Sequence, residues 1–154
     1  MLILACGNPS RGDDALGPLL IDRLGLDPDL ARRGIETLTD FQLQIEHVLD
    51  LQGRACVIFV DAAASGPEPF TFLPLCPSSE TSFSTHALAP GALLTLFRQV
   101  TGQTPPPARV LAIRGYGFAL GEPLSERASA NLDRAARFVS RLLRSDGCVG
   151  GSDQ

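Results

Sequence analysis

The sequence predicts a single three-layer α/β/α domain around a mostly parallel five-stranded sheet with one antiparallel strand. Short apolar runs alternate with longer segments whose apolar residues recur at helical spacing. The run 56–60, Cys-Val-Ile-Phe-Val, is apolar on both faces, as in a strand buried between two helical layers. The 154 residues suit one domain. We expect this domain to span 1–144, with 145–154 as a flexible tail.

The first half of the chain is expected to contain three strands and two helices. In order, these are a strand over 2–6, a helix over 16–24, a strand over 35–38, a helix over 42–51 and a strand over 55–60. The two helices are recognised by leucines and valines on one face. Gly25 and Gly53 stand where each helix should end.

The second half is expected to contain two strands and two helices. In order, these are a strand over 70–75, a helix over 90–100, a strand over 109–113 and a helix over 125–143. The connection from Asp61 to Phe70 is too short and too rich in proline for a crossover helix. The strand over 70–75 should therefore run antiparallel to its predecessor. Pro90 suits a first helical turn, and Ser125 can cap the last helix.

Composition argues against several partners. The formal net charge is −4, no basic run occurs, and aromatic residues make up 6%. We therefore expect neither nucleic acid nor an anionic membrane as partner. The amino terminus lacks the pattern of a signal peptide, and no apolar run could span a bilayer, so a cytoplasmic location is expected. The four cysteines form no C-x-x-C pair and are expected to be buried apolar residues rather than disulfides or zinc ligands.

Four polar residues mark the loops where chemistry is expected. In parallel α/β sheets, ligands bind outside the carboxyl ends of the strands. Asp13 and Asp14 follow the first strand, Asp61 ends the strand over 55–60, and His86 lies in a polar loop before a helix. Each has a plainer interpretation. An aspartate can cap a helix or close a turn, and a histidine can be solvated.

Other chemistries are disfavoured by the motifs that the sequence lacks. The first loop has neither the dinucleotide-binding fingerprint nor a P-loop. There is no G-x-S-x-G elbow and no H-E-x-x-H zinc motif. Cys6 is expected to point into the core, and His47 is interpreted as a surface or packing residue. Two carboxylates and one imidazole, if they meet, would suit a divalent cation such as nickel or zinc with open positions.

The order of these motifs resembles that of the hydrogenase maturation endopeptidases, over nearly the whole chain. The matching pieces are Gly7-Asn8, Asp13-Asp14-x-x-Gly17, a hydrophobic strand ending in Asp61-Ala62, Ser84-Thr85-His86, and Gly121-x-Pro123-Leu124-Ser125. Segment 40–47 looks like the branch that serves NAD-reducing bidirectional hydrogenases.

The resemblance implies an activity and a site. Family members remove a C-terminal extension from a [NiFe] hydrogenase large-subunit precursor in which the metals are already installed. By this resemblance Asp14, Asp61 and His86 would contact nickel that the substrate supplies, and Asp14 or Asp61 would be the general base. Family members often carry Glu where Asp14 stands, so Asp13 stays an alternative contact. The loops 77–82 and 115–123 are candidates for gripping the extension.

Two alternatives remain on sequence grounds. A non-catalytic nickel-binding maturation chaperone would use the same ligands and cleave nothing. A small-molecule or nucleotide-binding α/β module is disfavoured by the acidic first loop, because two carboxylates at a helix start repel a phosphate.

Overall fold

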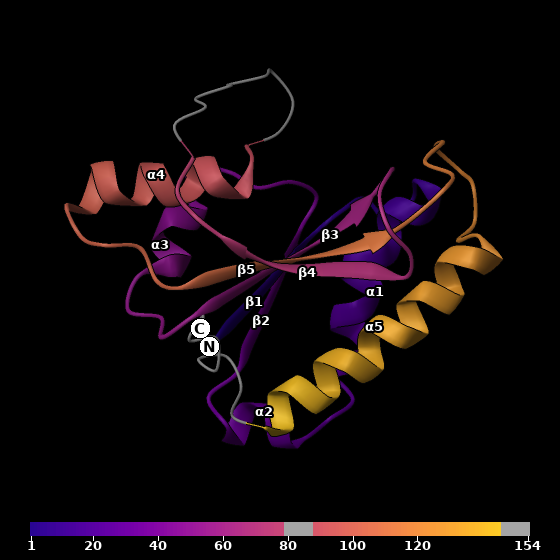
Figure 1. Ribbon diagram of the computed structural model, residues 1–154, viewed down its shortest axis with the longest axis horizontal. Coiled ribbons are helices and arrows are strands. Elements are labelled where there is room, and N and C mark those ends of the chain that lie inside the picture. Colours follow the sequence, from indigo (N-terminus) through magenta and orange to yellow (C-terminus); the bar gives the residue numbers. More distant parts are fainter. Residues whose placement is uncertain (79–87, 146–154) are drawn as a thin grey trace.

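A computed structural model of the chain describes residues 1–78 and 88–145. One five-stranded sheet has the order β2-β1-β3-β5-β4. The strands are β1 (Leu2–Cys6), β2 (Glu36–Asp40), β3 (Val57–Ala63), β4 (Phe70–Leu75) and β5 (Ala108–Arg114). The first four in this order run parallel, and β4 pairs antiparallel with β5 at one edge (Figure 1). The predicted fold class is confirmed.

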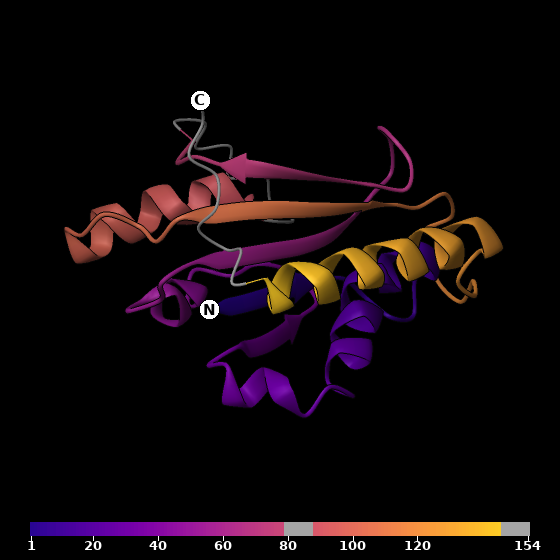
Figure 2. The ribbon, with the colours of Figure 1, turned by 60° about the horizontal axis from the view of Figure 1, so that its bottom comes forward.

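Helices cover both faces of the sheet. They are α1 (Leu16–Leu24), α2 (Asp29–Arg32), α3 (His47–Leu51), α4 (Pro90–Thr101) and α5 (Glu126–Arg144), with a 3-10 turn, η1 (Gly12–Ala15), before α1. Helices α1 and α5 lie on one face, and α3 and α4 lie on the other (Figures 1 and 2). Each face has its own apolar cluster. The domain is therefore a three-layer sandwich.

Strand β1 shows why the central strands are mostly apolar. Successive side chains of a strand point to opposite faces. Leu2 and Leu4 pack in the cluster under α3 and α4, whereas Ile3 and Ala5 pack in the cluster under α1 and α5. All four are fully buried. A polar residue in this row can be tolerated only near the end of the strand, where the helical layers no longer cover it.

The main differences from the sequence expectation are two boundaries and one additional helix. The helix predicted over 42–51 is helical only in α3, because the residues before it form bends and turns. The short α2 was not predicted. Strand β3 continues past its expected end to Ala63, because β5 pairs with it as far as Arg114. Asp61 therefore lies inside β3 and not after it.

Strand β4 runs antiparallel as predicted, yet β5 separates it from its predecessor β3 in the sheet. A short connection determines the direction of a strand but does not determine which strand it pairs with.

None of the helices found in residues 1–78 and 88–145 combines the length and apolar character that a membrane span requires.

Two further expectations concern single residues and the tail. Cys56 is disulfide-bonded, so the expectation that no cysteine forms a disulfide is wrong at this position. Cys6 and Cys76 carry free thiols. The tail expected at 145–154 lies, after its first residue, outside the described residues.

Candidate functional site

A row of polar residues crosses the carboxyl edge of the sheet. In the parallel ladders Cys6 pairs with Asp40, and Ala5 pairs with Val60, the residue before Asp61. Because side chains alternate along a strand, Cys6, Asp40 and Asp61 point to the face that α3 and α4 cover. The sheet thus gathers two carboxyl groups and a thiol on one side of its carboxyl edge.

At Asp61, strand β3 pairs with a neighbouring strand on one side only. Beyond Val60, β3 pairs only with β5, where Asp61 is opposite Ala112. The Asp61 carboxylate accepts a hydrogen bond of 2.8 Å from the backbone N–H of Ala62. Although the residue is exposed on its open side, surrounding protein removes much of its water. This desolvation, together with the negative charge of Asp14, raises the pKa of Asp61 to about 6 against the effect of the hydrogen bond.

Asp14 approaches the same place from the loop after β1. It lies in η1 and is half-buried, and its carboxylate accepts a hydrogen bond of 2.8 Å from the backbone N–H of Asn8. Gly7 allows this approach: its φ is +150°, and a Cβ on it would lie 2.0 Å from the carbonyl oxygen of Asp14. A side chain at position 7 would therefore displace the turn that carries Asp14.

Asp13 faces away from this place and is fully buried. Its carboxylate accepts hydrogen bonds from the backbone N–H groups of Tyr116, Gly117 and Ser125 and from the Ser125 hydroxyl, at 2.7–3.1 Å. Burial opposes ionisation, but these hydrogen bonds outweigh it and lower the pKa of Asp13. Asp13 fastens the first loop to the start of α5. Neither aspartate makes the helix-capping bond considered from the sequence.

A pocket of about 250 Å³ connects these features. Its walls come from β1, β3, the loop after β2 and the start of α4, and its lining residues are Leu4, Cys6, Asp14, Phe41, Gln42, Leu43, Phe59, Val60, Asp61, Leu88, Pro90 and Val110. Among the described residues that line it, Asp14 and Asp61 are the only acids, and the others are largely apolar. The pocket can thus hold a polypeptide or a cation beside two carboxylates. Asp13 does not line it.

Cys6 belongs both to the core and to this pocket. It is 8% exposed and packs in the cluster under α3 and α4, as expected. Burial, followed by the charges of Asp61, Asp40 and Asp14, raises the pKa of its thiol to about 12. Because the thiolate is the nucleophilic form, Cys6 is a poor nucleophile at neutral pH.

His86, the third predicted ligand, lies outside the described residues. Leu88 and Pro90, which follow it closely in the sequence, line the pocket. Within residues 1–78 and 88–145, no group of three or more His, Cys, Asp or Glu side chains is arranged to hold a metal ion. The structure therefore brings together Asp14 and Asp61 and leaves the third position untested.

The loop 115–123, expected to grip a substrate, supports the first loop. Asp13 N–H donates to the Gly117 carbonyl at 2.7 Å, and Gly12 N–H donates to the Glu122 carbonyl at 3.1 Å. The backbone of this loop thus holds the turn on which Asp14 is mounted. In the loop 77–82, only Pro77 and Ser78 are described.

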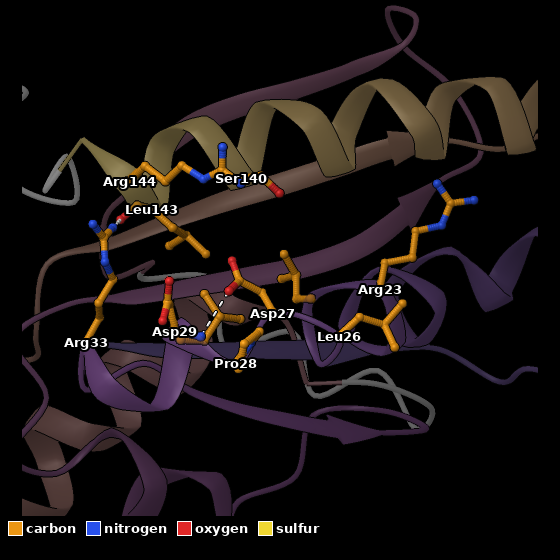
Figure 3. Close-up of a pocket in the computed structure, with 11 residues that line it drawn as sticks. Arg23, Leu26, Asp27, Pro28, Asp29, Arg33, Ser140, Leu143 and Arg144 are labelled. Carbon is orange, nitrogen blue, oxygen red and sulfur yellow. Dashed lines mark hydrogen bonds between the residues drawn. The ribbon is translucent and has the colours of Figure 1, made fainter.

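A larger cavity of about 570 Å³ lies on the other face, between α1, α2 and the C-terminal half of α5 (Figure 3). Two of its polar residues make hydrogen bonds to the backbone that support the fold. Asp27 accepts from the backbone N–H of Asp29, and Arg33 donates to the carbonyl of Leu143. It lies away from the carboxyl edge of the sheet, so the smaller pocket is the better candidate site.

Comparison with solved structures finds the same fold in several proteins. The [NiFe] hydrogenase maturation protease HycI from Thermococcus kodakarensis superposes with a TM-score of 0.68 at 24% identity, over 93% of this chain and 92% of that one. The hydrogenase maturating endopeptidase HybD from E. coli gives 0.70 at 22% identity, over 95% and 93%. A hydrogenase 2 maturation peptidase from Thaumarchaeota archaeon SCGC_AB-539-E09 gives 0.64 at 22% identity, over 93% and 97%.

Sequence comparison alone finds less. No protein-family model matches the chain, and no curated protein matches it. At identities of 22–24% the structural likeness shows a shared fold over nearly the whole length.

Proposed function

We propose that this chain is a cytoplasmic hydrogenase maturation endopeptidase. It removes the C-terminal extension of a [NiFe] hydrogenase large-subunit precursor. The observation that carries the proposal is the pairing of Asp14 and Asp61 in one pocket at the carboxyl edge of the sheet. The proposal is supported by the names of proteins that share the fold, which are maturation proteases of hydrogenases.

The proposal adds His86 and a nickel ion that belongs to the substrate. Imidazole and carboxylate ligands together suit nickel, and two carboxylates alone leave its shell incomplete. Leu88, two residues after His86 in the sequence, lines the pocket. A protease that requires nickel in its precursor would not cleave a precursor without nickel. Cleavage would therefore follow metal insertion.

The two aspartates divide the work in this proposal. Asp14 is fixed by the Asn8 N–H and contributes a carboxylate of defined position. Asp61 is exposed beside the pocket and has, in the protein without metal, a pKa raised to about 6. We assign it the role of general base, which takes a proton from a water and later returns it. Nickel in the substrate would hold the scissile segment and polarise its carbonyl.

The attacking group is then a water and not the protein. The Cys6 thiol is protonated at neutral pH because burial and three acidic neighbours raise its pKa. Asp61 is exposed, so water has access to its carboxylate. The pocket therefore suits water activation better than an enzyme-bound covalent intermediate.

The proposal is tested with purified protein and a large-subunit precursor loaded with nickel. The mass of the intact precursor is measured before and after incubation. The proposal is supported if the nickel-loaded precursor loses its C-terminal extension and the precursor without nickel keeps it. If nickel binds but the precursor keeps its mass, the chain is instead a non-catalytic nickel-binding chaperone. Asp22→Asn, an exposed change on α1, is the control for loss of one negative charge.

A further inference from the structure

We propose that His47 is a positioning residue that holds one wall of the candidate pocket. That wall is segment 41–46, between β2 and α3. Phe41, Gln42 and Leu43 of this segment line the pocket. The inference rests on the proposed function for its activity test alone, since the contacts of His47 can be tested on the protein without substrate.

The His47 ring contacts backbone and side chain at the two ends of the segment. The residue is 8% exposed and begins α3. Its Nδ1 accepts a hydrogen bond of 2.8 Å from the backbone N–H of Gln44. This bond uses the Nδ1 lone pair, so the ring proton lies on Nε2. Nε2 lies 3.4 Å from the Oδ2 atom of Asp40, and the ring therefore links Gln44 to the end of β2.

Asp40 extends this link to the loop that carries Asp14. Its Oδ1 accepts a hydrogen bond of 2.7 Å from the backbone N–H of Phe41. Its carbonyl oxygen accepts another, of 3.1 Å, from the backbone N–H of Gly7. A continuous set of contacts thus runs from His47 through Asp40 to the first loop. Because Asp40 is engaged in this way, its carboxylate is not free to serve the pocket.

Apolar burial does little to fix the segment. Phe41 is 69% exposed and Ile45 is 59% exposed, and only Leu43 is anchored in the core, at 6%. Bends and turns, without sheet pairing, make up 41–46. The polar contacts of the His47 ring therefore act together with the buried Leu43 side chain and with turn hydrogen bonds, such as that from Val48 N–H to the Ile45 carbonyl, in holding the wall. Phe41 also lines a second hollow of about 230 Å³, so a displaced wall would change the shape of both spaces.

Three substitutions separate the roles of the two ring nitrogens. His47→Phe keeps an aromatic ring and removes both nitrogens. In His47→Asn, Oδ1 stands at the same number of bonds from Cβ as Nδ1 and can accept from Gln44. In His47→Gln, the terminal amide stands where Nε2 does and faces Asp40. Leu49→Ala, which changes a side chain of α3 that is 71% exposed, is the control.

The first measurement is hydrogen exchange of the Gln44 amide in the protein alone, with unfolding by urea measured in parallel. One lost hydrogen bond of about 1.4 kcal/mol corresponds to about tenfold faster local exchange. We expect this acceleration in His47→Phe and His47→Gln, and near-native exchange in His47→Asn and Leu49→Ala. Native exchange of Gln44 in His47→Phe would overturn the inference, whatever the activity.

The second measurement is cleavage kinetics on nickel-loaded precursor. A displaced wall weakens substrate binding more than chemistry, so KM should rise about tenfold in His47→Phe while kcat changes less than about threefold. In His47→Asn, which keeps an acceptor for the Gln44 N–H, KM should stay close to the wild-type value. Equal loss of kcat in the Phe and Asn variants, with native stability, would contradict positioning. If the wild-type protein cleaves nothing, the proposed function fails, and the exchange measurement still decides the role of His47.

Discussion

Asp13 and Ser125, 112 residues apart in the sequence, are joined by two hydrogen bonds. The Ser125 backbone N–H and hydroxyl both donate to the Asp13 carboxylate, at 2.8 and 2.7 Å. The same hydroxyl accepts from the Ala128 N–H at 3.2 Å and so caps α5. Asp13 thus ties the loop that carries Asp14 to the longest helix of the domain.

Replacing Asp13 should destabilise the protein. In Asp13→Asn the amide group would face backbone N–H donors and leave buried partners unsatisfied. The free energy of unfolding should fall by about 2–3 kcal/mol, measured by urea denaturation. The exposed control Asp22→Asn should stay within about 0.5 kcal/mol of wild type. Well below the unfolding temperature, Asp13→Asn should keep more activity than Asp14→Asn. The reverse order would mean that Asp13 serves the pocket.

Stability should also depend on pH through Asp13. Hydrogen bonds lower the pKa of this group in the folded state below its ordinary value of 3.8. The folded state therefore holds the proton less tightly than the unfolded state does. The contribution of Asp13 is complete above that ordinary value and is lost as pH falls through the lower, folded value. Urea denaturation from pH 6 to pH 3 should show a shallower loss in Asp13→Asn than in wild type. Parallel curves would contradict this account.

Gly7 should tolerate substitution less well than Gly53. Both have positive φ, of +150° and +74°. A Cβ at position 53 meets nothing within 4 Å, whereas one at position 7 would lie 2.0 Å from the Asp14 carbonyl. Gly53→Ala should cost about 1 kcal/mol of unfolding free energy from backbone strain, and Gly7→Ala about 3 kcal/mol or more. Equal losses of unfolding free energy in the two variants would show that the first loop can move to accommodate a side chain at position 7.

The carboxyl group of Asp61 should titrate abnormally in the isolated protein. Carbon-detected NMR should give a pKa near 6, because desolvation and the charge of Asp14 both disfavour ionisation. Asp14→Asn removes the charge and should lower the pKa of Asp61. Asp22→Asn should leave it unchanged. An Asp61 pKa that does not respond to Asp14→Asn would mean that the two carboxylates do not share the pocket.

Apolar periodicity was enough to predict the layers of the fold. It did not predict where α3 begins or which strand β4 pairs with. Continuous apolar runs predicted the central strands β1 and β3, because such strands are buried on both faces. The edge strands β2 and β4 were predicted from shorter runs that include polar residues or proline. The start of α3 was placed too early, since the contacts of His47 and Asp40 shape the preceding segment. The position of β4 beyond β5 could not be deduced from the length of one connection.

The candidate site, like the fold, could be predicted from the sequence only in part. Strand ends predicted that Asp14 and Asp61 lie at the carboxyl edge, but spacing alone could not join them. The choice between Asp13 and Asp14 depended on hydrogen bonds from Tyr116 and Ser125, more than 100 residues away. No local pattern carries that information. The role of His47 was missed for a similar reason, because its partner Asp40 belongs to a different element.

The most direct test of the central claim is the intact mass of a nickel-loaded large-subunit precursor after incubation with the wild-type chain and its variants. Wild type and Asp22→Asn should remove the C-terminal extension, whereas Asp14→Asn, Asp61→Asn and His86→Ala should slow removal by about 100-fold or more while unfolding like wild type. An extension that stays on the loaded precursor with wild-type protein, or wild-type processing by Asp61→Asn, would contradict the account.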